Sequence, residues 1–212
     1  FYNSPYKSFS AFSGNPYFID LPDLHRRGLL SEGELAGARQ NTPYACEFER
    51  LSRERMKLLS TAAGRAREDR TLWRAVSAFM EANPHVNEFC RFMEGKGNFT
   101  YQAWAFTQYM FFTQWREIKQ YANQKGVEII GDIPIYVDLD SADVWANPEL
   151  FQLDETGRPE CVAGVPPDYF CEDGQLWGNP LYDWDTMRQD GYRWWRQRTE
   201  YMFQFFDGVR MD

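Results

Sequence analysis

The chain has 212 residues, of which 43% are hydrophobic, 17% aromatic and 25% charged, so its composition is that of a folded globular protein rather than a disordered one. It carries 31 acidic against 23 basic residues and a formal net charge of -8, with no basic stripe, which argues against nucleic-acid binding. No apolar run approaches the roughly 20 residues that a membrane span needs, and the first residues lack the pattern of an export signal. We therefore expect a cytoplasmic protein with no nucleic-acid or membrane partner.

The cysteines and histidines are spaced too widely for a zinc site or a dense disulfide framework. They are Cys46, Cys90, Cys161, Cys171, His25 and His85. We expect reduced thiols, no metal site and no required cofactor.

The two ends of the chain are unusual for a natural protein. The first residue is not Met, and the last residue, Asp212, follows directly after a strand-like run at 205–211. Natural termini tend to fray from the surface. We expect the chain to be a segment of a longer protein.

The first hundred residues divide into two parts of different composition. Residues 1–24 are rich in Ser, Pro and aromatic residues, and Tyr17–Leu21 is predicted to be a short buried strand that Pro22 ends. Residues 25–100 are rich in Glu, Arg, Ala, Leu and Met, which predicts a mostly helical inserted subdomain without chemistry of its own.

The next segment predicts a helix followed by a strand. Large apolar side chains recur at three- and four-residue steps from Tyr101 to Lys125, and Gly126 is placed to end that helix. The β-branched run at 127–137 then predicts a strand.

The last third predicts a long loop, a helix and a final strand. Residues 138–185 are an irregular stretch with proline clusters, and such long loops are usually functional. Asp185 is the predicted N-cap of a helix that runs to about Gln204. The order of elements predicts an α/β fold with a parallel sheet, in which 1–24 and 101–212 form part of a (β/α)8 barrel whose active-site loops include 138–185. A complete barrel takes roughly 250 residues, so this chain holds only part of one.

Arg210 and Asp212 are candidates for catalysis because residues two apart on a strand share one face. At the carboxyl end of a barrel strand, Asp212 would suit a nucleophile that Arg210 keeps charged. A structural ion pair is the alternative interpretation.

Polar residues beside aromatic ones predict a carbohydrate-binding site. Asp132, Asp168, Gln175 and Trp177 occur among many aromatic residues of the same region. Pyranose C–H faces pack on aromatic rings, and sugar hydroxyls need polar partners. The alternative is that the rings pack the loop onto the barrel, which we favour for Trp145, Phe151 and Trp184.

Several long strings closely resemble the 4-alpha-glucanotransferase family, also called amylomaltase or disproportionating enzyme. The strings are S-P-Y-K-S-F-S-A-F-S-G-N-P (4–16), G-D-I-P-I-Y-V (131–137), D-S-A-D-V-W-A-N-P-E-L-F (140–151), V-A-G-V-P-P-D-Y-F (162–170), G-Q-L-W-G-N-P-L-Y (174–182) and V-R-M-D (209–212). Residues 25–100 contribute little. Met211 and Cys171 depart from the family pattern, where Ile and Ser are usual.

The resemblance implies an amylase-related (β/α)8 barrel that moves 1,4-linked α-glucan segments to the 4-hydroxyl of another glucan, with maltooligosaccharides and related α-1,4-glucans as partners. It also implies that Asp212 is the nucleophile of a retaining double displacement and that Arg210 is its electrostatic partner. The acid/base Glu of the family follows on a later strand, so we expect this segment alone to be inactive.

The resemblance also implies substrate-binding residues. Asp132 is similar to an aspartate on the third strand that contacts the sugar next to the cleavage point, and Tyr6, with Ser4 beside it, is similar to a tyrosine that stacks there. Asp168, Gln175 and Trp177 are similar to groups on the flexible loop that covers the substrate.

Two alternatives stay open at this point. An α-glucan hydrolase of the amylase superfamily would differ in its acceptor preference, and a non-catalytic α-glucan-binding module would bind starch-like chains without cleaving them.

Overall fold

A computed structural model describes residues 7–97, 99–169 and 171–211. The chain divides into two compact units, one of them Gly14–Ile118 and the other made of the segments before and after it. The helical unit therefore includes residues on both sides of the predicted 25–100 subdomain. None of the helices in the described ranges is long and apolar enough to cross a membrane.

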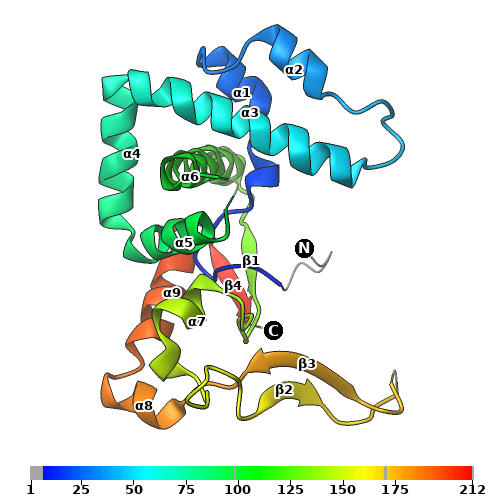
Figure 1. Ribbon diagram of the computed structural model, residues 1–212, viewed down its shortest axis with the longest axis vertical. Helices are drawn as coiled ribbons and strands as arrows, with labels where there is room; N and C mark the ends of the chain where they lie inside the picture. Colours follow the sequence, from blue (N-terminus) through cyan, green and yellow to red (C-terminus); the bar gives the residue numbers. More distant parts are fainter. Residues whose placement is uncertain (1–6, 98, 170, 212) are drawn as a thin grey trace. The chain divides into compact units, whose positions relative to one another are not determined.

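The helical unit is built around the long helix α6 (Tyr101–Gln124), with α3, α4 and α5 next to it (Figure 1). Its other elements are η1 (Pro16–Phe18), α1 (Leu21–Arg26), α2 (Glu32–Ala38), α3 (Phe48–Glu68), α4 (Arg70–Ala82) and α5 (Pro84–Gly95). Aromatic contacts form its core: the Phe79 and Phe112 rings lie 5.8 Å apart, and the Phe89 and Trp104 rings 5.5 Å apart. The predictions of a helical segment and of an amphipathic helix from Tyr101 are confirmed.

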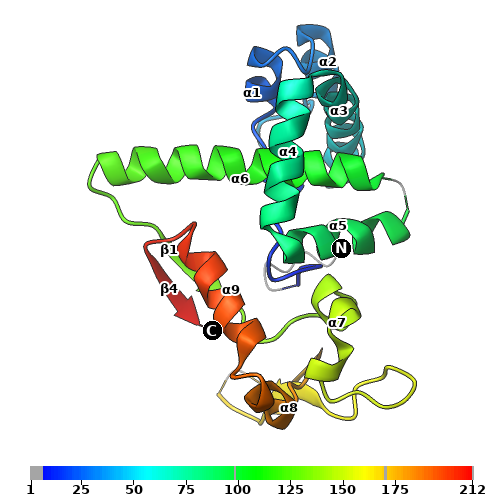
Figure 2. The ribbon, with the colours of Figure 1, turned by 90° about the vertical axis from the view of Figure 1, so that its left-hand side faces the viewer.

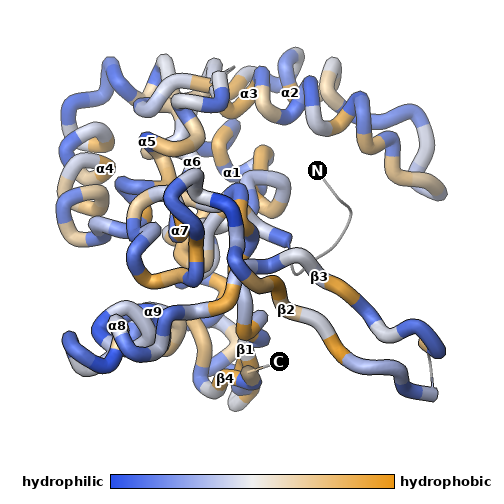
Figure 3. The backbone as a smooth tube through the Cα atoms, turned by 60° about the horizontal axis from the view of Figure 1, so that its bottom comes forward, coloured by the Kyte–Doolittle hydropathy of each residue, from blue (hydrophilic) through white to orange (hydrophobic). Residues whose placement is uncertain are grey.

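Local signals explain where these helices begin and end. Ser31 and Glu34 form a reciprocal capping box at the start of α2, and the Asp69 carboxylate caps the start of α4. Gly126 has a φ of +75°, a left-handed conformation that suits glycine just after α6. Hydrophilic and hydrophobic stretches both occur along α3 (Figure 3). Its buried residues recur at helical spacing and are Leu58, Leu59, Ala62, Ala63 and Ala66.

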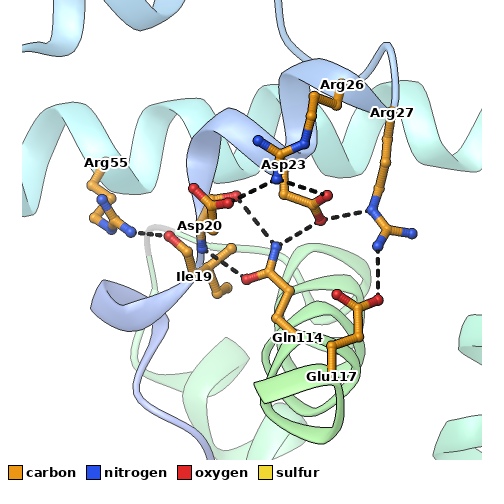
Figure 4. Close-up of polar contacts among 8 residues, drawn as sticks. All are labelled: Ile19, Asp20, Asp23, Arg26, Arg27, Arg55, Gln114 and Glu117. Atoms are coloured by element: carbon orange, nitrogen blue, oxygen red, sulfur yellow. Dashed lines mark hydrogen bonds and ion pairs between the residues drawn. The ribbon is translucent and has the colours of Figure 1, made fainter. Parts of the chain in front are cut away.

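The predicted strand at Tyr17–Leu21 is wrong, because this segment forms η1 and the start of α1. Pro16 and Pro22 stand in the first turns of these two helices, where a missing N–H costs nothing. Gln114 of α6 accepts a hydrogen bond from the Asp20 N–H at 2.7 Å and donates to the Asp23 carboxylate at 2.9 Å (Figure 4). Arg55 of α3 donates to the Ile19 carbonyl oxygen. These partners satisfy backbone groups that a strand would have paired with another strand.

The second unit contains a parallel strand pair, β1 (Ile130–Ile133) and β4 (Gly208–Met211), with α9 beside it (Figures 1 and 2). Between these strands the chain forms α7 (Ala142–Ala146), η2 (Pro148–Leu150), β2 (Val162–Val165), β3 (Gln175–Pro180), α8 (Trp184–Gln189) and α9 (Arg193–Phe203). Strands β2 and β3 pair as an antiparallel ribbon. The predictions of an α/β fold and of a parallel pair are confirmed.

Three boundaries in this unit differ from the sequence-based expectation. The strand predicted at 127–137 covers only Ile130–Ile133, and the region 138–185 contains short helices and a ribbon rather than an irregular loop alone. The predicted helix from Asp185 to Gln204 is two helices, and its cap is Asp183. The break lies at Gly191 and Tyr192, which have φ values of +68° and +57°, because left-handed backbone ends α8 before α9 begins.

Candidate active site

The site begins where the two parallel strands end. Strands β1 and β4 pair in a register that places Asp132 opposite Arg210, so the two side chains leave the sheet next to each other. Glycines permit this close pairing: a Cβ on Gly131 would lie 2.5 Å from the Phe206 ring, and one on Gly208 would lie 2.9 Å from Ile130. The pairing of β1 with β4 therefore depends on glycine residues as well as on β-branched residues.

Arg210 and Asp132 form a two-point ion pair. The Arg210 Nε atom donates to Asp132 Oδ1 at 3.0 Å, and Nη2 donates to Oδ2 at 2.7 Å. The hydrogen bonds from Arg210 lower the pKa of the Asp132 carboxyl group below its ordinary value. Both side chains remain accessible, Arg210 at 60% and Asp132 at 39% exposure. A charged carboxylate is thus held in one orientation while it can still accept further hydrogen bonds.

The spacing along the last strand predicts that Arg210 partners Asp212, whereas the structure shows Arg210 bound to Asp132. Asp212 lies outside the described residues, so its predicted partnership with Arg210 stays a prediction. A spacing of two residues along one strand was visible in the sequence, whereas a pairing across 78 residues needed the register of the strands.

Asp207 anchors the amino ends of both strands. Its carboxylate accepts hydrogen bonds from Lys119 Nζ at 2.6 Å, Asn123 Nδ2 at 2.9 Å and the Ile129 N–H at 2.8 Å. The Lys119 contact and these N–H donors lower the pKa of Asp207 to about 2. Asp207 thereby ties the last turn of α6 to the segment entering β1. Sequence reasoning missed it, although an acidic residue directly before a strand was a signal.

The turn after β1 is held by side chains from distant parts of the sequence. The Tyr182 hydroxyl donates to the Ile135 carbonyl oxygen at 2.8 Å, and Asn179 Nδ2 donates to the Val137 carbonyl oxygen at 2.8 Å. The Tyr136 ring stacks on Tyr182 at 6.1 Å between centroids and lies 6.4 Å from the Trp177 ring. The turn that follows Asp132 is therefore connected to the ribbon.

The ribbon brings together two of the predicted substrate-binding residues. Gln175 and Trp177 stand two apart on β3, and Trp177 Nε1 donates to Gln175 Oε1 at 3.0 Å. The Trp177 side chain is 42% exposed, so much of its ring is available for a ligand. Asp168 lies in the turn of the ribbon, where its carboxylate accepts a hydrogen bond from the Cys171 N–H at 2.9 Å.

The N-terminal segment runs beside the residues that follow this turn. Lys7 Nζ lies 4.0 Å from Asp138 Oδ2, and the Ala11 N–H donates to Asp143 Oδ2 at 2.8 Å. Ser4 and Tyr6, which precede Lys7, lie outside the described residues. Their predicted roles in binding substrate stay predictions.

The profile of glycoside hydrolase family 77, described as 4-alpha-glucanotransferase, matches residues 2–105 and 96–212, which together cover nearly the whole chain. The chain belongs to the 4-alpha-glucanotransferase family. The resemblance stated from the sequence strings is confirmed.

Relatives and a solved structure agree with membership of the 4-alpha-glucanotransferase family. A 4-alpha-glucanotransferase of Streptococcus pneumoniae is 39% identical over 242 aligned positions, and one of Thermus thermophilus is 38% identical over 244. Each alignment covers 99% of this chain and 48% of the relative. The structure of amylomaltase from Streptococcus agalactiae in complex with acarbose matches this chain with a TM-score of 0.91 and 34% sequence identity. The match covers 99% of this chain and 48% of the amylomaltase chain. The chain thus spans about half the length of the relatives that it matches.

The Cys, His, Asp and Glu residues of this 4-alpha-glucanotransferase family member bear on metal binding and disulfide formation. Within the described ranges, no group of three or more His, Cys, Asp or Glu side chains is arranged to hold a metal ion. The described thiols of Cys46, Cys90, Cys161 and Cys171 are all free of disulfides.

Proposed function

We propose that this chain supplies the nucleophile side of a 4-alpha-glucanotransferase that transfers 1,4-α-glucan segments to the 4-hydroxyl of an acceptor glucan or glucose. The match to the family along nearly the whole chain carries this proposal. The Asp132–Arg210 pair at the ends of two parallel strands supports it, because this is the edge where barrel enzymes hold their catalytic groups. We also propose that β1 and β4 belong to a (β/α)8 barrel, with β1 as its third strand.

In the proposed reaction, the Asp212 carboxylate attacks the anomeric carbon while the glycosidic oxygen leaves and takes up a proton. The 4-hydroxyl of the acceptor then attacks the glycosyl-enzyme, the ester bond to Asp212 breaks, the hydroxyl proton returns to the acid/base carboxyl group, and the configuration is retained. Such a mechanism needs a second carboxyl group roughly 5 to 5.5 Å from the nucleophile. We propose that a Glu outside these 212 residues supplies it, in keeping with the half-length coverage of the relatives.

Charges at the strand ends fit this reaction. The transition state carries positive charge on the sugar ring, so ionised carboxylates near it are stabilising. Arg210 keeps Asp132 ionised and leaves its remaining lone pairs to accept hydrogen bonds from sugar hydroxyls. We propose that Arg210 does the same for Asp212.

The ribbon and the N-terminal segment are proposed to bind the glucan chain. Trp177 offers an exposed ring, and its hydrogen bond to Gln175 fixes the orientation of that ring. Asp168, Ser4 and Tyr6 complete the proposed substrate contacts. Transfer exceeds hydrolysis only if water is kept from the glycosyl-enzyme, and an aromatic loop closing over the sugar would exclude it. No metal or organic cofactor is required in this scheme.

Incubation with maltotriose tests the proposed function. A protein of full family length that carries these 212 residues should convert maltotriose into a ladder of longer glucans plus glucose, and its Asp212→Asn variant should produce none. Glucose and maltose alone would show a hydrolase. Unchanged maltotriose that still binds would show a non-catalytic glucan-binding module. Either result would refute the transferase proposal.

A further inference from the structure

Arg198 on α9 is a buried arginine that takes no part in the proposed reaction. Only 2% of its surface is exposed, and burial lowers its pKa from the ordinary value. An arginine nevertheless stays charged in a protein, so a full positive charge is buried here. Removing that charge from water is costly, and it is tolerated only where the guanidinium finds well-placed acceptors.

Arg198 donates to backbone carbonyl groups of the turn that follows β1, and the nearby Tyr182 hydroxyl and Asp143 carboxylate also favour its charge. Nη2 donates to the Pro134 carbonyl oxygen at 2.6 Å, and Nη1 lies 3.5 Å from the Ile135 carbonyl oxygen. The guanidinium also lies 5.4 Å from the Trp194 ring centroid and 5.0 Å from that of Trp195, so both rings can stabilise the charge. The guanidinium therefore contacts both the rings of α9 and the backbone of the turn.

This turn connects the proposed substrate-binding groups of the unit. It starts two residues after Asp132, and it contains Tyr136, whose ring contacts those of Tyr182 and Trp177. The Ile135 carbonyl oxygen that Arg198 approaches also accepts the Tyr182 hydroxyl. Arg198 and Tyr182 therefore act on the same point of the backbone.

We propose that Arg198 is a positioning residue for glucan transfer, which it serves by fixing the Pro134–Ile135 backbone and hence the directions of Asp132 and Tyr136. This inference rests on the proposed function. Arg198 touches no substrate in this scheme. Its effect passes through the turn, and a displacement of about 1 Å at a reacting or binding group can cost roughly 100-fold in rate.

Three variants of the full-family-length protein test this role. Arg198→Met fills the same space without donors, Arg198→Lys keeps the charge but lacks the planar fork that reaches two carbonyls, and Arg196→Met is the matched control on the exposed part of the same helix. For each variant we would measure kcat and KM with maltotriose well below its Tm, and the Tm itself.

We expect kcat/KM of Arg198→Met to fall by about 10- to 100-fold, with an intermediate loss for Arg198→Lys and no change for Arg196→Met. The Tm of Arg198→Met should fall, because the Pro134 and Ile135 carbonyl oxygens lose the Arg198 donor, so kcat and KM are compared only where each variant is fully folded. A merely structural arginine would lower Tm and leave the folded protein fully active.

The inference is overturned if folded Arg198→Met keeps kcat/KM within about threefold of the parent, or if its activity loss only follows the fraction unfolded. Should Arg198→Met fail to fold, the folded Arg198→Lys variant decides by the same criterion. If the parent protein itself shows no transfer, the proposed function is refuted, and this inference with it. Measuring the unsubstituted parent protein distinguishes that outcome from a failure of the Arg198 inference alone.

Discussion

The guanidinium of Arg210 binds both oxygens of Asp132, which a lysine ammonium cannot do with the same geometry. We predict that Arg210→Lys in a protein of full family length lowers kcat/KM for maltotriose by about 10- to 100-fold, because Asp132 is no longer held in one orientation. Arg188→Lys is the control, since Arg188 forms an exposed ion pair with Asp185 on α8. Equal kinetics of the two variants would show that the fork geometry of Arg210 is unimportant.

Asp207 makes the stability of the strand pair dependent on pH. Its pKa in the folded chain is lowered to about 2, below the ordinary carboxyl value, so its ionised form stabilises the fold above about pH 4 and this contribution is lost as the pH falls toward about 2. We predict that Asp207→Asn lowers Tm near pH 7 and that the difference from the parent shrinks between about pH 4 and pH 2.

Thermal unfolding from about pH 7 to about pH 2, followed by circular dichroism, checks this. Asp185→Asn on α8 is a suitable control, because its exposed ion pair should contribute little at any pH. A Tm difference for Asp207→Asn that stays constant over the whole range would contradict the assigned role of its charge.

At the scale of elements, the antiparallel ribbon carries Trp177 on β3. We predict that Trp177→Ala in a protein of full family length raises hydrolysis relative to transfer, because water then reaches the glycosyl-enzyme more easily. The ratio of free glucose to transferred glucan measures this. Leu176→Ala, a neighbouring exposed position on the same strand, is the control. A ratio that Trp177→Ala leaves unchanged would count against a water-excluding role for the ribbon.

Two glycines in regular elements should respond to alanine in opposite ways. A Cβ on Gly64, within α3, would meet no described atom within 4 Å, so Gly64→Ala should stabilise the chain by about 0.5 to 1 kcal/mol through its better helix propensity. A Cβ on Gly131, within β1, would lie 2.5 Å from the Phe206 ring, so Gly131→Ala should destabilise it by about 1 to 3 kcal/mol. Urea unfolding of both variants tests the pair, and a loss for Gly64→Ala would show that α3 is constrained in a way its contacts do not reveal.

At the scale of the whole molecule, the 212 residues match about half of each relative. We predict that the isolated chain, although folded, transfers no glucan, because a retaining mechanism needs the second carboxyl group. Maltotriose incubation with product separation tests this, alongside circular dichroism to show that the chain is folded. A ladder of longer glucans made by the isolated chain would contradict the assignment of the acid/base to a residue outside it.

Some of this structure could be read directly from local patterns. The helix from Tyr101, the strand before Pro134 and the helical composition of the 25–100 region follow from periodicity and propensity, which act over a few residues. The sequence strings around Asp132, Trp177 and Arg210 were long enough to indicate the family, since they contain the residues of the candidate site. Local patterns failed at the strand predicted for Tyr17–Leu21.

What the sequence by itself determined is therefore the family, the α/β class and most element types. Tertiary structure alone decided that Gln114 holds the first helix, that Arg210 meets Asp132 rather than only its neighbours along the strand, and that Arg198 is buried beneath a turn. The physical reason is distance along the chain: Asp132 and Arg210 stand 78 residues apart, and only the register of two parallel strands brings their charges within hydrogen-bonding range.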